Sequence, residues 1–346
     1  MKTFGNDGMA WENRLKEYPN MLTTQKEVLD IALAWQGSRA LLAAVELNLF
    51  STVGEGSTAA EIAERVGTDT RCTERLLNVM VTLDLMSKQG EVFINGPAAS
   101  QYLVPDGNDY LSMLHHTAFT YRNWGALDQA VRAGTSTIST AWDSDEHRDA
   151  FIEAMHRRSR GDAENLVNSL DLSGVDHLLD VGGGSGAYSI ALCQANKGIK
   201  STVLDLPGVT QLTRKYVAEA GLSERIGTRE GSYLETEFGA GYDLVLFSAI
   251  VHINSEQENQ FLMHKAFEAV NPGGVIAVHD FIMSEDRLTP AKGAMFALNM
   301  IVNTRGGDTY TKGEISGWLM DAGCETLHST RTGEMTSMLT ARKPLA

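Results

Sequence analysis

Cysteine is scarce in this sequence, and the few cysteines present exclude two common uses of the thiol. Three occur among 346 residues, at Cys72, Cys193 and Cys324, with no CxxC pair among them. Neither a disulfide framework nor a zinc site is therefore predicted, and we expect no other metal site. The pattern is typical of buried, reduced thiols in a cytoplasmic protein.

Long apolar runs are also missing. We find no stretch of about 18 apolar residues that would span a bilayer. The beginning of the chain carries Asp7, Glu12 and Glu17, where a secretory signal would be apolar. We expect a soluble protein with no membrane partner.

Positive charge is the third scarcity. The chain has 29 Lys and Arg against 44 Asp and Glu, which gives a net charge of −15. Such a surface repels phosphate backbones, so nucleic acid is not expected as a partner. The length, in contrast, exceeds what one ordinary core requires. We expect two domains, at residues 1–110 and 111–346.

Residues 27–50 have apolar side chains at helical spacing. The apolar positions are Ile31, Ala34, Trp35, Leu41, Leu42, Val45 and Leu49. This pattern predicts one or two amphipathic helices with broad apolar faces. A small domain cannot cover such faces alone, so we expect them to be shared between the two chains of a homodimer.

The next segment follows the order helix, turn, helix, hairpin. Thr58 and Glu61 have the spacing of a capping box and open a short helix that ends at Gly67. A second helix is expected at residues 70–85, and a Gln-Gly turn divides residues 86–94 into two short strands. This order is typical of a winged helix. The acidic charge favours a packing and dimerisation module over a DNA-binding one.

A glycine-dense turn is the strongest chemical motif. Residues 178–187 read LLDVGGGSGA, an apolar strand that runs into the turn, and a helix is expected at residues 188–194. Glycines let the backbone approach a ligand and expose amide donors at the start of the helix. Asp205 ends a second strand, where a carboxylate can accept both hydroxyls of a ribose. A nucleotide-type ligand is predicted, and the motif alone leaves NAD open.

Further strands are expected at residues 241–248 and 271–280, the latter after a Pro-Gly-Gly turn. Residues 107–169 are expected to be mostly helical, with a polar break at 134–140. Alternating strands and helices predict an α/β fold with a Rossmann-like, doubly wound sheet. In such a sheet, ligands bind at the carboxyl ends of the strands.

Five segments in this order resemble the motifs of the class I S-adenosylmethionine-dependent O-methyltransferases. They are LDVGGGSGAYSIAL, VLDLPGV, GYDLVLFSAIVH, NPGGVIAVHDFI and GGDTYTKGEISGWLMDAG. The family includes plant phenolic, acetylserotonin and bacterial small-molecule enzymes, and its N-terminal dimerisation domain resembles the helical, winged-helix-like region described above. The resemblance implies S-adenosylmethionine as cofactor, a homodimer, and methyl transfer to a small acceptor, often an aromatic hydroxyl.

The resemblance also implies which residues hold the cofactor. Gly182, Gly184 and Ser185 would border its methionine part, and Asp205 its ribose. Leu206 would lie beside the adenine. Ser232 stands where the family usually has an Asp, and Tyr233 follows at the position of the family's bulky residue. Ser248 would lie at the rim of the site.

His252 matches the position of the family's general base. An imidazole can take up a proton near neutral pH, although a histidine that caps the next helix or fills the core remains an alternative. Asp280 matches an acidic residue that flanks and orients the base. The family's second flanking acidic position falls at Thr309, beside Asp308.

Acceptor contacts are expected from two groups of side chains, at residues Met295, Phe296, Asn299, Met300 and Asn303 on one helical face and at His116, Trp124 and Met155 earlier in the chain. An ordinary core seam is the alternative for both groups.

We therefore predict an enzyme that methylates a hydroxyl of a small aromatic or polyketide-like molecule. A carbon- or nitrogen-directed methyltransferase would have the same cofactor site. A winged-helix regulator that senses the cofactor is the alternative from another functional class.

Overall fold

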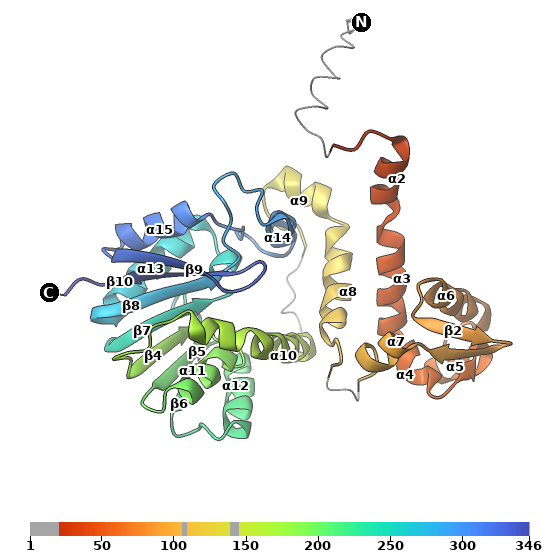
Figure 1. The fold of residues 1–346 in the computed structure, drawn as a ribbon, viewed down its shortest axis with the longest axis horizontal. Coiled ribbons are helices and arrows are strands. Elements are labelled where there is room, and N and C mark those ends of the chain that lie inside the picture. The colour runs from red at the N-terminus through yellow and green to blue at the C-terminus, as the bar shows by residue number, and fades with distance from the viewer. Residues whose placement is uncertain (1–20, 106–108, 139–144, 346) are drawn as a thin grey trace, which may run out of the picture. The chain divides into compact units, whose positions relative to one another are not determined.

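The computed structural model describes residues 21–105, 109–138 and 145–345. The chain divides into two compact units, Met1–Tyr110 and Leu111–Ala346 (Figure 1).

The first unit has a helix pair at its start and a winged-helix arrangement after it. Its elements are α2 (Gln25–Leu33), α3 (Trp35–Glu46), α4 (Leu49–Val53), β1 (Ser57–Thr58), α5 (Ala59–Val66), α6 (Thr70–Thr82), β2 (Met86–Gln89), β3 (Val92–Asn95) and α7 (Pro97–Tyr102). Thr58 and Glu61 form the predicted capping box, and Gly67 ends α5 with a φ of 72°. The predicted hairpin is confirmed, and β1 joins it in a sheet of order β1-β3-β2.

The apolar face of α2 and the start of α3 are uncovered within this unit, whereas Leu42, Ala44 and Val45 near the end of α3 are buried. Val28, Leu29, Ile31, Leu33 and Trp35 are between 46% and 66% exposed. Over residues 25–46 the two helices together are long and apolar enough to cross a membrane by length and composition, with 17% of the most apolar window buried. The sequence prediction that no such stretch exists was therefore wrong, because it counted unbroken apolar runs and missed one interrupted by single charged residues.

The expectation that all three thiols are buried was also wrong. Cys193 and Cys324 are buried, and burial raises the pKa of each thiol to about 11. Cys72 is exposed, since it lies in the first turn of α6 on the solvent side. The Cys72 amide donates to the N-cap carboxylate of Asp69 at 2.8 Å.

The second unit is built on a seven-stranded sheet of order β6-β5-β4-β7-β8-β10-β9. Its strands are β4 (His177–Val181), β5 (Lys200–Asp205), β6 (Ile226–Glu230), β7 (Tyr242–Ser248), β8 (Val270–Asp280), β9 (Glu325–Arg331) and β10 (Ser337–Arg342). The strands from β6 to β8 are parallel, whereas β10 is inserted antiparallel between β8 and β9. The predicted strands all lie in this sheet, and its order reverses beside β4.

Helices cover both faces of this sheet. The helices of this unit are α8 (Met113–Trp124), α9 (Leu127–Ala133), α10 (Asp145–Asn168), α11 (Ala187–Ala195), α12 (Pro207–Glu219), α13 (Glu256–Ala269), α14 (Ala291–Asn303) and α15 (Lys312–Asp321), with a 3-10 turn η1 (Val251–Ile253). The helical prediction for residues 107–169 agrees with α8, α9 and α10, and part of the predicted break at 134–140 lies outside the described residues.

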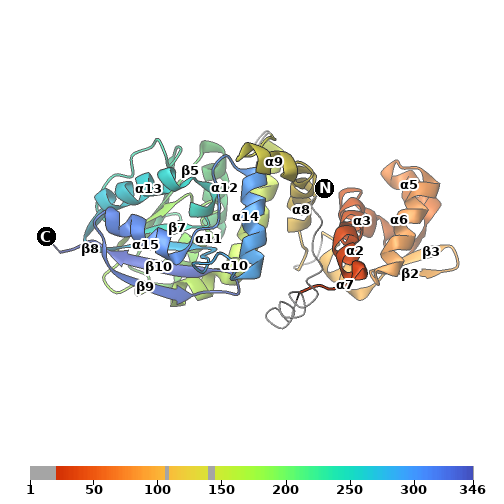
Figure 2. The ribbon, with the colours of Figure 1, turned by 90° about the horizontal axis from the view of Figure 1, so that it is seen from above.

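Alternate side chains of each central strand enter opposite cores. Val245 and Phe247 of β7 pack on the side of α13 and α15, whereas Leu244 and Leu246 pack on the side of α10, α11 and α12. Burial on both faces explains why these strands are almost continuously apolar in sequence. Figure 2 shows α8, α9 and α14 grouped together beside the sheet, and α14 packs against both other helices.

Candidate active site

The glycine turn joins β4 to α11. Gly182, Gly184 and Gly186 have positive φ angles of 65°, 57° and 76°. A side chain at Gly182 would also collide with Ile250, which directly precedes η1. Glycine avoids both the backbone strain and the collision. The turn can therefore present backbone amides to a ligand at the carboxyl end of β4.

Asp205 ends β5 and lies against this turn. Its Oδ2 accepts a hydrogen bond from the Gly184 amide and its Oδ1 one from the Leu206 amide, both at 2.8 Å. Burial raises the pKa of the Asp205 carboxyl, and the two backbone donors oppose this rise. The Gly231 amide donates to the Asp205 carbonyl at 2.9 Å. The loop with Ser232 is thereby held beside the turn.

Tyr233 connects this loop to the turn that carries His252. Its hydroxyl donates to Oδ1 of Asn254 at 3.1 Å. The Asn254 side-chain amide donates to the Ile250 carbonyl. The backbone carbonyl of Asn254 accepts a hydrogen bond from the Tyr310 hydroxyl at 2.6 Å. Burial raises the pKa of Tyr233 to about 12. Leu206, which was predicted to lie beside the adenine, is 44% exposed.

Ser185 is fixed from outside the turn. Its hydroxyl lies 2.8 Å from Nδ1 of His156 on α10, and that ring stacks on Tyr216 of α12 with centroids 3.9 Å apart. Ser185 itself is 5% exposed. Helix α10 therefore stabilises the glycine turn, a role that its sequence did not indicate.

Ser248 ends β7 and belongs to a second buried network. Its hydroxyl lies 3.0 Å from Nδ1 of His279, and Nε2 of that histidine lies 3.0 Å from the Thr332 hydroxyl. Burial lowers the pKa of His279, which favours its neutral form. The network ties the ends of β7 and β8 to the β9–β10 hairpin.

His252 and Asp280 form a buried pair. The ring Nδ1 lies 2.6 Å from Asp280 Oδ1, and the His252 amide donates to Oδ2 of the same carboxylate. Burial alone would raise the pKa of Asp280, but the charge and hydrogen bonds of His252 and the Phe281 amide outweigh it, so the pKa lies below its usual value. An ionised carboxylate cannot donate, so Nδ1 carries the proton, and in the neutral form of the ring Nε2 has the free lone pair.

Two phenylalanine rings surround the imidazole. The Phe281 and Phe296 centroids lie 5.6 and 5.0 Å from that of His252, both edge-on, and 4.2 Å from each other. Phe281 directly follows Asp280, the last residue of β8, and Phe296 lies on α14. Aromatic walls beside a histidine suit a flat acceptor.

The second flanking position contains no carboxylate directed at the imidazole. Thr309 occupies it and is 2% exposed. The Asp308 amide donates to the His252 carbonyl at 3.1 Å, while its carboxylate lies 3.5 Å from Arg287. Asp308 therefore supports the backbone of the turn.

Three of the predicted acceptor residues are joined by hydrogen bonds. The Trp124 indole donates to Oδ1 of Asn299 at 2.9 Å, and Asn123 donates to Oδ1 of Asn303 at 2.7 Å. The Asn303 side-chain amide donates in turn to the Asn299 carbonyl at 2.8 Å. These contacts fix α8 against α14.

The other predicted acceptor residues have different surroundings. Met295 is 58% exposed, whereas Met300 is 7% exposed and belongs to the core. His116 packs on Phe151 of α10 with centroids 4.9 Å apart, and burial lowers its pKa. Met155 is half-buried on the same helix. The burial of Met300 favours the alternative that this side chain packs in the core and does not contact the acceptor.

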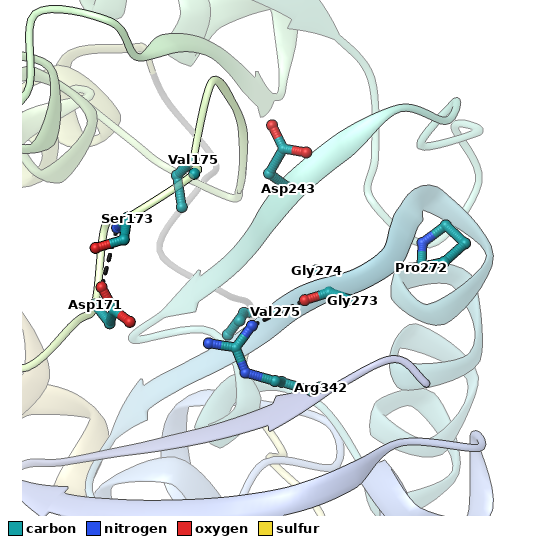
Figure 3. A pocket seen from close by; sticks show the side chains of 10 residues that line it. Asp171, Ser173, Val175, Asp243, Pro272, Gly273, Gly274, Val275 and Arg342 are labelled. Carbon is teal, nitrogen blue, oxygen red and sulfur yellow. Dashed lines mark hydrogen bonds between the residues drawn. The ribbon is translucent and has the colours of Figure 1, made fainter. Parts of the chain in front are cut away.

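A shallow hollow lies at the other end of the sheet (Figure 3). Its lining residues are Asp171, Ser173, Gly174, Val175, Asp243, Pro272, Gly273, Gly274, Val275 and Arg342. These residues lie before or at the starts of β4, β7 and β8, apart from Arg342, which is the last residue of the antiparallel β10. Asp243 accepts from the His177 amide and from Asn271, and Arg342 donates to the Gly273 carbonyl. The polar groups thus connect strand starts, and the hollow is remote from the residues described above.

Comparison with known proteins decides the family. The model of the O-methyltransferase domain matches residues 126–325, and that of the O-methyltransferase dimerisation domain matches residues 29–105. The chain belongs to the S-adenosylmethionine-dependent O-methyltransferase family. The predicted family, fold class, enzyme class and cofactor are thereby confirmed, and the N-terminal unit contains a dimerisation domain.

Individual members of this O-methyltransferase family are similar over most of their length. The chain is 31% identical to the 3-hydroxy-5-methyl-1-naphthoate 3-O-methyltransferase of Streptomyces sahachiroi, covering 90% of this chain and 91% of that protein. It is also 31% identical to the L-tyrosine C(3)-methyltransferase of Streptomyces lavendulae, over 79% and 80%. The structure of human N-acetylserotonin methyltransferase in complex with S-adenosylmethionine matches with a TM-score of 0.80 and 26% identity, covering 94% of this chain and 99% of that one.

Several residues of the site were not predicted from the sequence. They are His156, Arg158, Asn254, His279 and Phe281. Phe281 could have been found, because it directly follows Asp280. Asn254 and His279 could likewise have been found, because they lie two residues after His252 and directly before Asp280, whereas His156 and Arg158 come close to the site only through tertiary packing.

Proposed function

We propose that this enzyme transfers a methyl group from S-adenosylmethionine to a hydroxyl of an aromatic or polyketide-like small molecule, with His252 as the general base. The His252–Asp280 pair carries the proposal, because its geometry leaves Nε2 able to accept a proton. His252 lies just after β7, and Asp280 is the last residue of β8. The pair is therefore at the edge of the sheet where ligands bind in doubly wound folds. The hydroxynaphthoate in the name of the Streptomyces sahachiroi relative supports an aromatic acceptor.

The glycine turn and its neighbours fit the cofactor. Asp205 would accept the ribose hydroxyls, since carboxylate lone pairs remain beside its two backbone donors. Gly182, Gly184 and Ser185 would border the methionine part. We assign Leu206, Ser232 and Tyr233 to the adenine side and Ser248 to the rim. When bound, S-adenosylmethionine supplies an electrophilic methyl group on a positively charged sulfur.

His252 would take the hydroxyl proton of the acceptor at Nε2 while the acceptor oxygen becomes methylated. Asp280 holds the ring in the tautomer that this requires and stabilises the imidazolium that forms. Because the pKa of Asp280 lies below its usual value, the carboxylate stays ionised at neutral pH. Proton removal prevents a positive charge from building up on the methylated oxygen.

The acceptor would lie against Phe281 and Phe296, within reach of residues from three helices. We assign acceptor contacts to His116, Trp124, Met155, Met295, Asn299 and Asn303, with Met300 supporting α14 from the core. Oδ1 of Asn299 accepts from Trp124 and Asn303, and Oδ1 of Asn303 accepts from Asn123, which gives a fixed polar edge beside the rings.

The N-terminal unit would form a homodimer through α2 and α3. Their exposed apolar side chains support this, because a second copy would cover them. We assign residues 1–110 to dimerisation and 111–346 to catalysis, in line with the separate domain matches. A cytoplasmic enzyme without nucleic acid or membrane partners remains our expectation from the net charge of −15.

Product analysis tests the function. The purified protein is incubated with S-adenosylmethionine and a panel of hydroxylated aromatic compounds, and products are identified by mass spectrometry and NMR. O-methyl ethers are expected, and acceptors whose hydroxyl is already methylated should be inert. Carbon-methylated products would favour the chemistry named for the Streptomyces lavendulae relative. Failure of S-adenosylhomocysteine to bind in calorimetry would contradict the proposal altogether.

A further inference from the structure

Arg158 of α10 lies beside the aromatic rings that surround His252. Its guanidinium carbon is 5.8 Å from the centroid of Phe281. That ring also contacts His252 and Phe296, at 5.6 and 4.2 Å. A single aromatic ring therefore separates this cation from the proposed base.

The guanidinium lacks a carboxylate partner within the part of the chain that the structure describes. Its neighbour Arg157 pairs with Glu153 at 3.1 Å, and Arg148 on the same helix pairs with Asp149 at 2.7 Å. Asp280, next to Phe281, is bound to His252. Arg160 of the same helix also has no ion pair among the described residues, so Arg158 is distinguished by its contact with Phe281 and not by the lack of a partner.

An acceptor that stacks in this region would change the solvation of Arg158. The side chain is exposed to solvent without a ligand, and an aromatic molecule placed against Phe281 and Phe296 would displace part of its water. A cation that loses water without gaining a partner destabilises the complex. A carboxylate on the acceptor would remove this penalty, because the planar guanidinium can bind its two oxygens together.

We propose that Arg158 binds a carboxylate carried by the acceptor, so that the substrates are hydroxylated aryl carboxylates. The inference rests on the proposed function, since it assumes that the acceptor hydroxyl faces His252. The carboxylate bound by Arg158 could belong either to the methionine part of the cofactor or to the acceptor. Burial raises the pKa of Tyr188, at the start of α11, and the charge of Arg158 opposes this rise, so the cation is also near the cofactor end. The stacking on Phe281 favours the acceptor.

Calorimetry on the full-length protein tests the assignment. The protein, saturated with S-adenosylhomocysteine, is titrated with hydroxynaphthoates and hydroxybenzoates and with the naphthols and phenols that lack only the carboxylate. Carboxylates should bind wild type more tightly than their neutral partners. Arg158→Gln should weaken carboxylate binding about 10- to 100-fold and leave neutral compounds and S-adenosylhomocysteine nearly unchanged. Arg157→Gln, on the same helix but paired with Glu153, is the matched control.

Each other outcome has a defined meaning. If Arg158→Gln weakens S-adenosylhomocysteine and leaves the carboxylate preference intact, the bound carboxylate belongs to the cofactor and the acceptor assignment is overturned. The assignment also fails if no carboxylate binds wild type better than its neutral partner, or if Arg157→Gln has the same effect as Arg158→Gln. Wild type that does not bind S-adenosylhomocysteine would contradict the proposed function itself. Circular dichroism confirms that each variant is folded.

Discussion

The hydroxyl of Tyr233 donates a hydrogen bond to Oδ1 of Asn254 at 3.1 Å, and this contact joins the loop beside Asp205 to the turn that carries His252. Asn254 is 4% exposed, so its oxygen has little access to water. The cofactor side and the base are thus mechanically connected through one buried amide.

Tyr233→Phe should destabilise the protein, because the buried oxygen of Asn254 would lose its donor. Leaving a buried acceptor unpaired costs roughly 1–3 kcal/mol, which corresponds to a fall in melting temperature of several degrees for a unit of this size. Differential scanning calorimetry measures this fall in melting temperature. Tyr216→Phe is the control, since the Tyr216 ring stacks on His156 and its hydroxyl makes no hydrogen bond within the described residues. Equal losses in both variants would contradict the role of the Tyr233 hydroxyl.

Local sequence patterns predicted the elements that depend on neighbouring residues. The capping box at Thr58, the turn at Gly90 and the glycine turn at residues 182–186 each have a specific backbone requirement that few residue types satisfy. The strands β4 and β7 and the second half of β8 were predictable because burial on both faces makes them mostly apolar, whereas β5 has only Val203 and Leu204 as apolar residues and was predicted from its place after the glycine turn and its helix.

Elements defined by distant partners were not predictable. Strand β6 contains only one buried side chain, Ile226, and forms part of the sheet by pairing with β5. The insertion of β10 between β8 and β9 likewise has no local pattern. In the site, resemblance indicated His252 and Asp280, but their 2.6 Å contact spans 28 positions of sequence. Likewise, the contacts of His156 and Arg158 with the site depend on the packing of α10.

Asp205→Asn should weaken the binding of S-adenosylhomocysteine. The substitution removes a charged acceptor for the ribose and places an amide NH₂ group against one of the two backbone donors that the carboxylate now satisfies. We expect a dissociation constant roughly 10- to 100-fold higher in titration calorimetry. Asp321→Asn, at the exposed end of α15, should bind as wild type does. Unchanged affinity in Asp205→Asn would remove the ribose assignment.

His252→Ala should lower turnover by a factor of roughly 10²–10⁴ and leave the affinity for S-adenosylhomocysteine nearly unchanged. Asp280→Asn should cause a smaller loss, because it removes the orientation and charge support of the ring but leaves the imidazole. Steady-state kinetics with the identified acceptor provide the turnover, and His264→Ala on the exposed side of α13 is the control. Retention of most activity by His252→Ala would mean that transfer proceeds without this base.

Light scattering should give a mass about twice the 37.6 kDa of the chain. Ile31→Glu places a charge in the centre of the exposed face of α2 and should shift the equilibrium towards monomer. The control is Val131→Glu, at a 60% exposed position of α9 in the other unit. A wild-type monomer at micromolar concentration, or a dimer unaffected by Ile31→Glu, would exclude this face as the interface.

Asp180, in the strand before the glycine turn, should make stability depend on pH. Burial raises the pKa of its carboxyl to about 6, against the opposing hydrogen bond from Ser189 at 2.6 Å. The folded protein therefore binds this proton more tightly than the unfolded chain does. As pH rises from 4 through 6, the free energy of unfolding should fall, and the full loss of about 3 kcal/mol should persist above pH 6.

Asp180→Asn cannot ionise and still offers an acceptor to Ser189. The free energy of unfolding of Asp180→Asn minus that of wild type should therefore increase between pH 4 and pH 8, as measured by urea titration at each pH. Asp171→Asn is the control, and its difference from wild type should stay nearly constant from pH 4 to pH 8, because this carboxyl titrates below that range. The hydrogen bonds from Ser173 lower the pKa of that exposed carboxyl, so it stabilises the folded protein at neutral pH and loses this effect as pH falls. A difference between Asp180→Asn and wild type that stays constant from pH 4 to pH 8 would show that Asp180 does not titrate in this range.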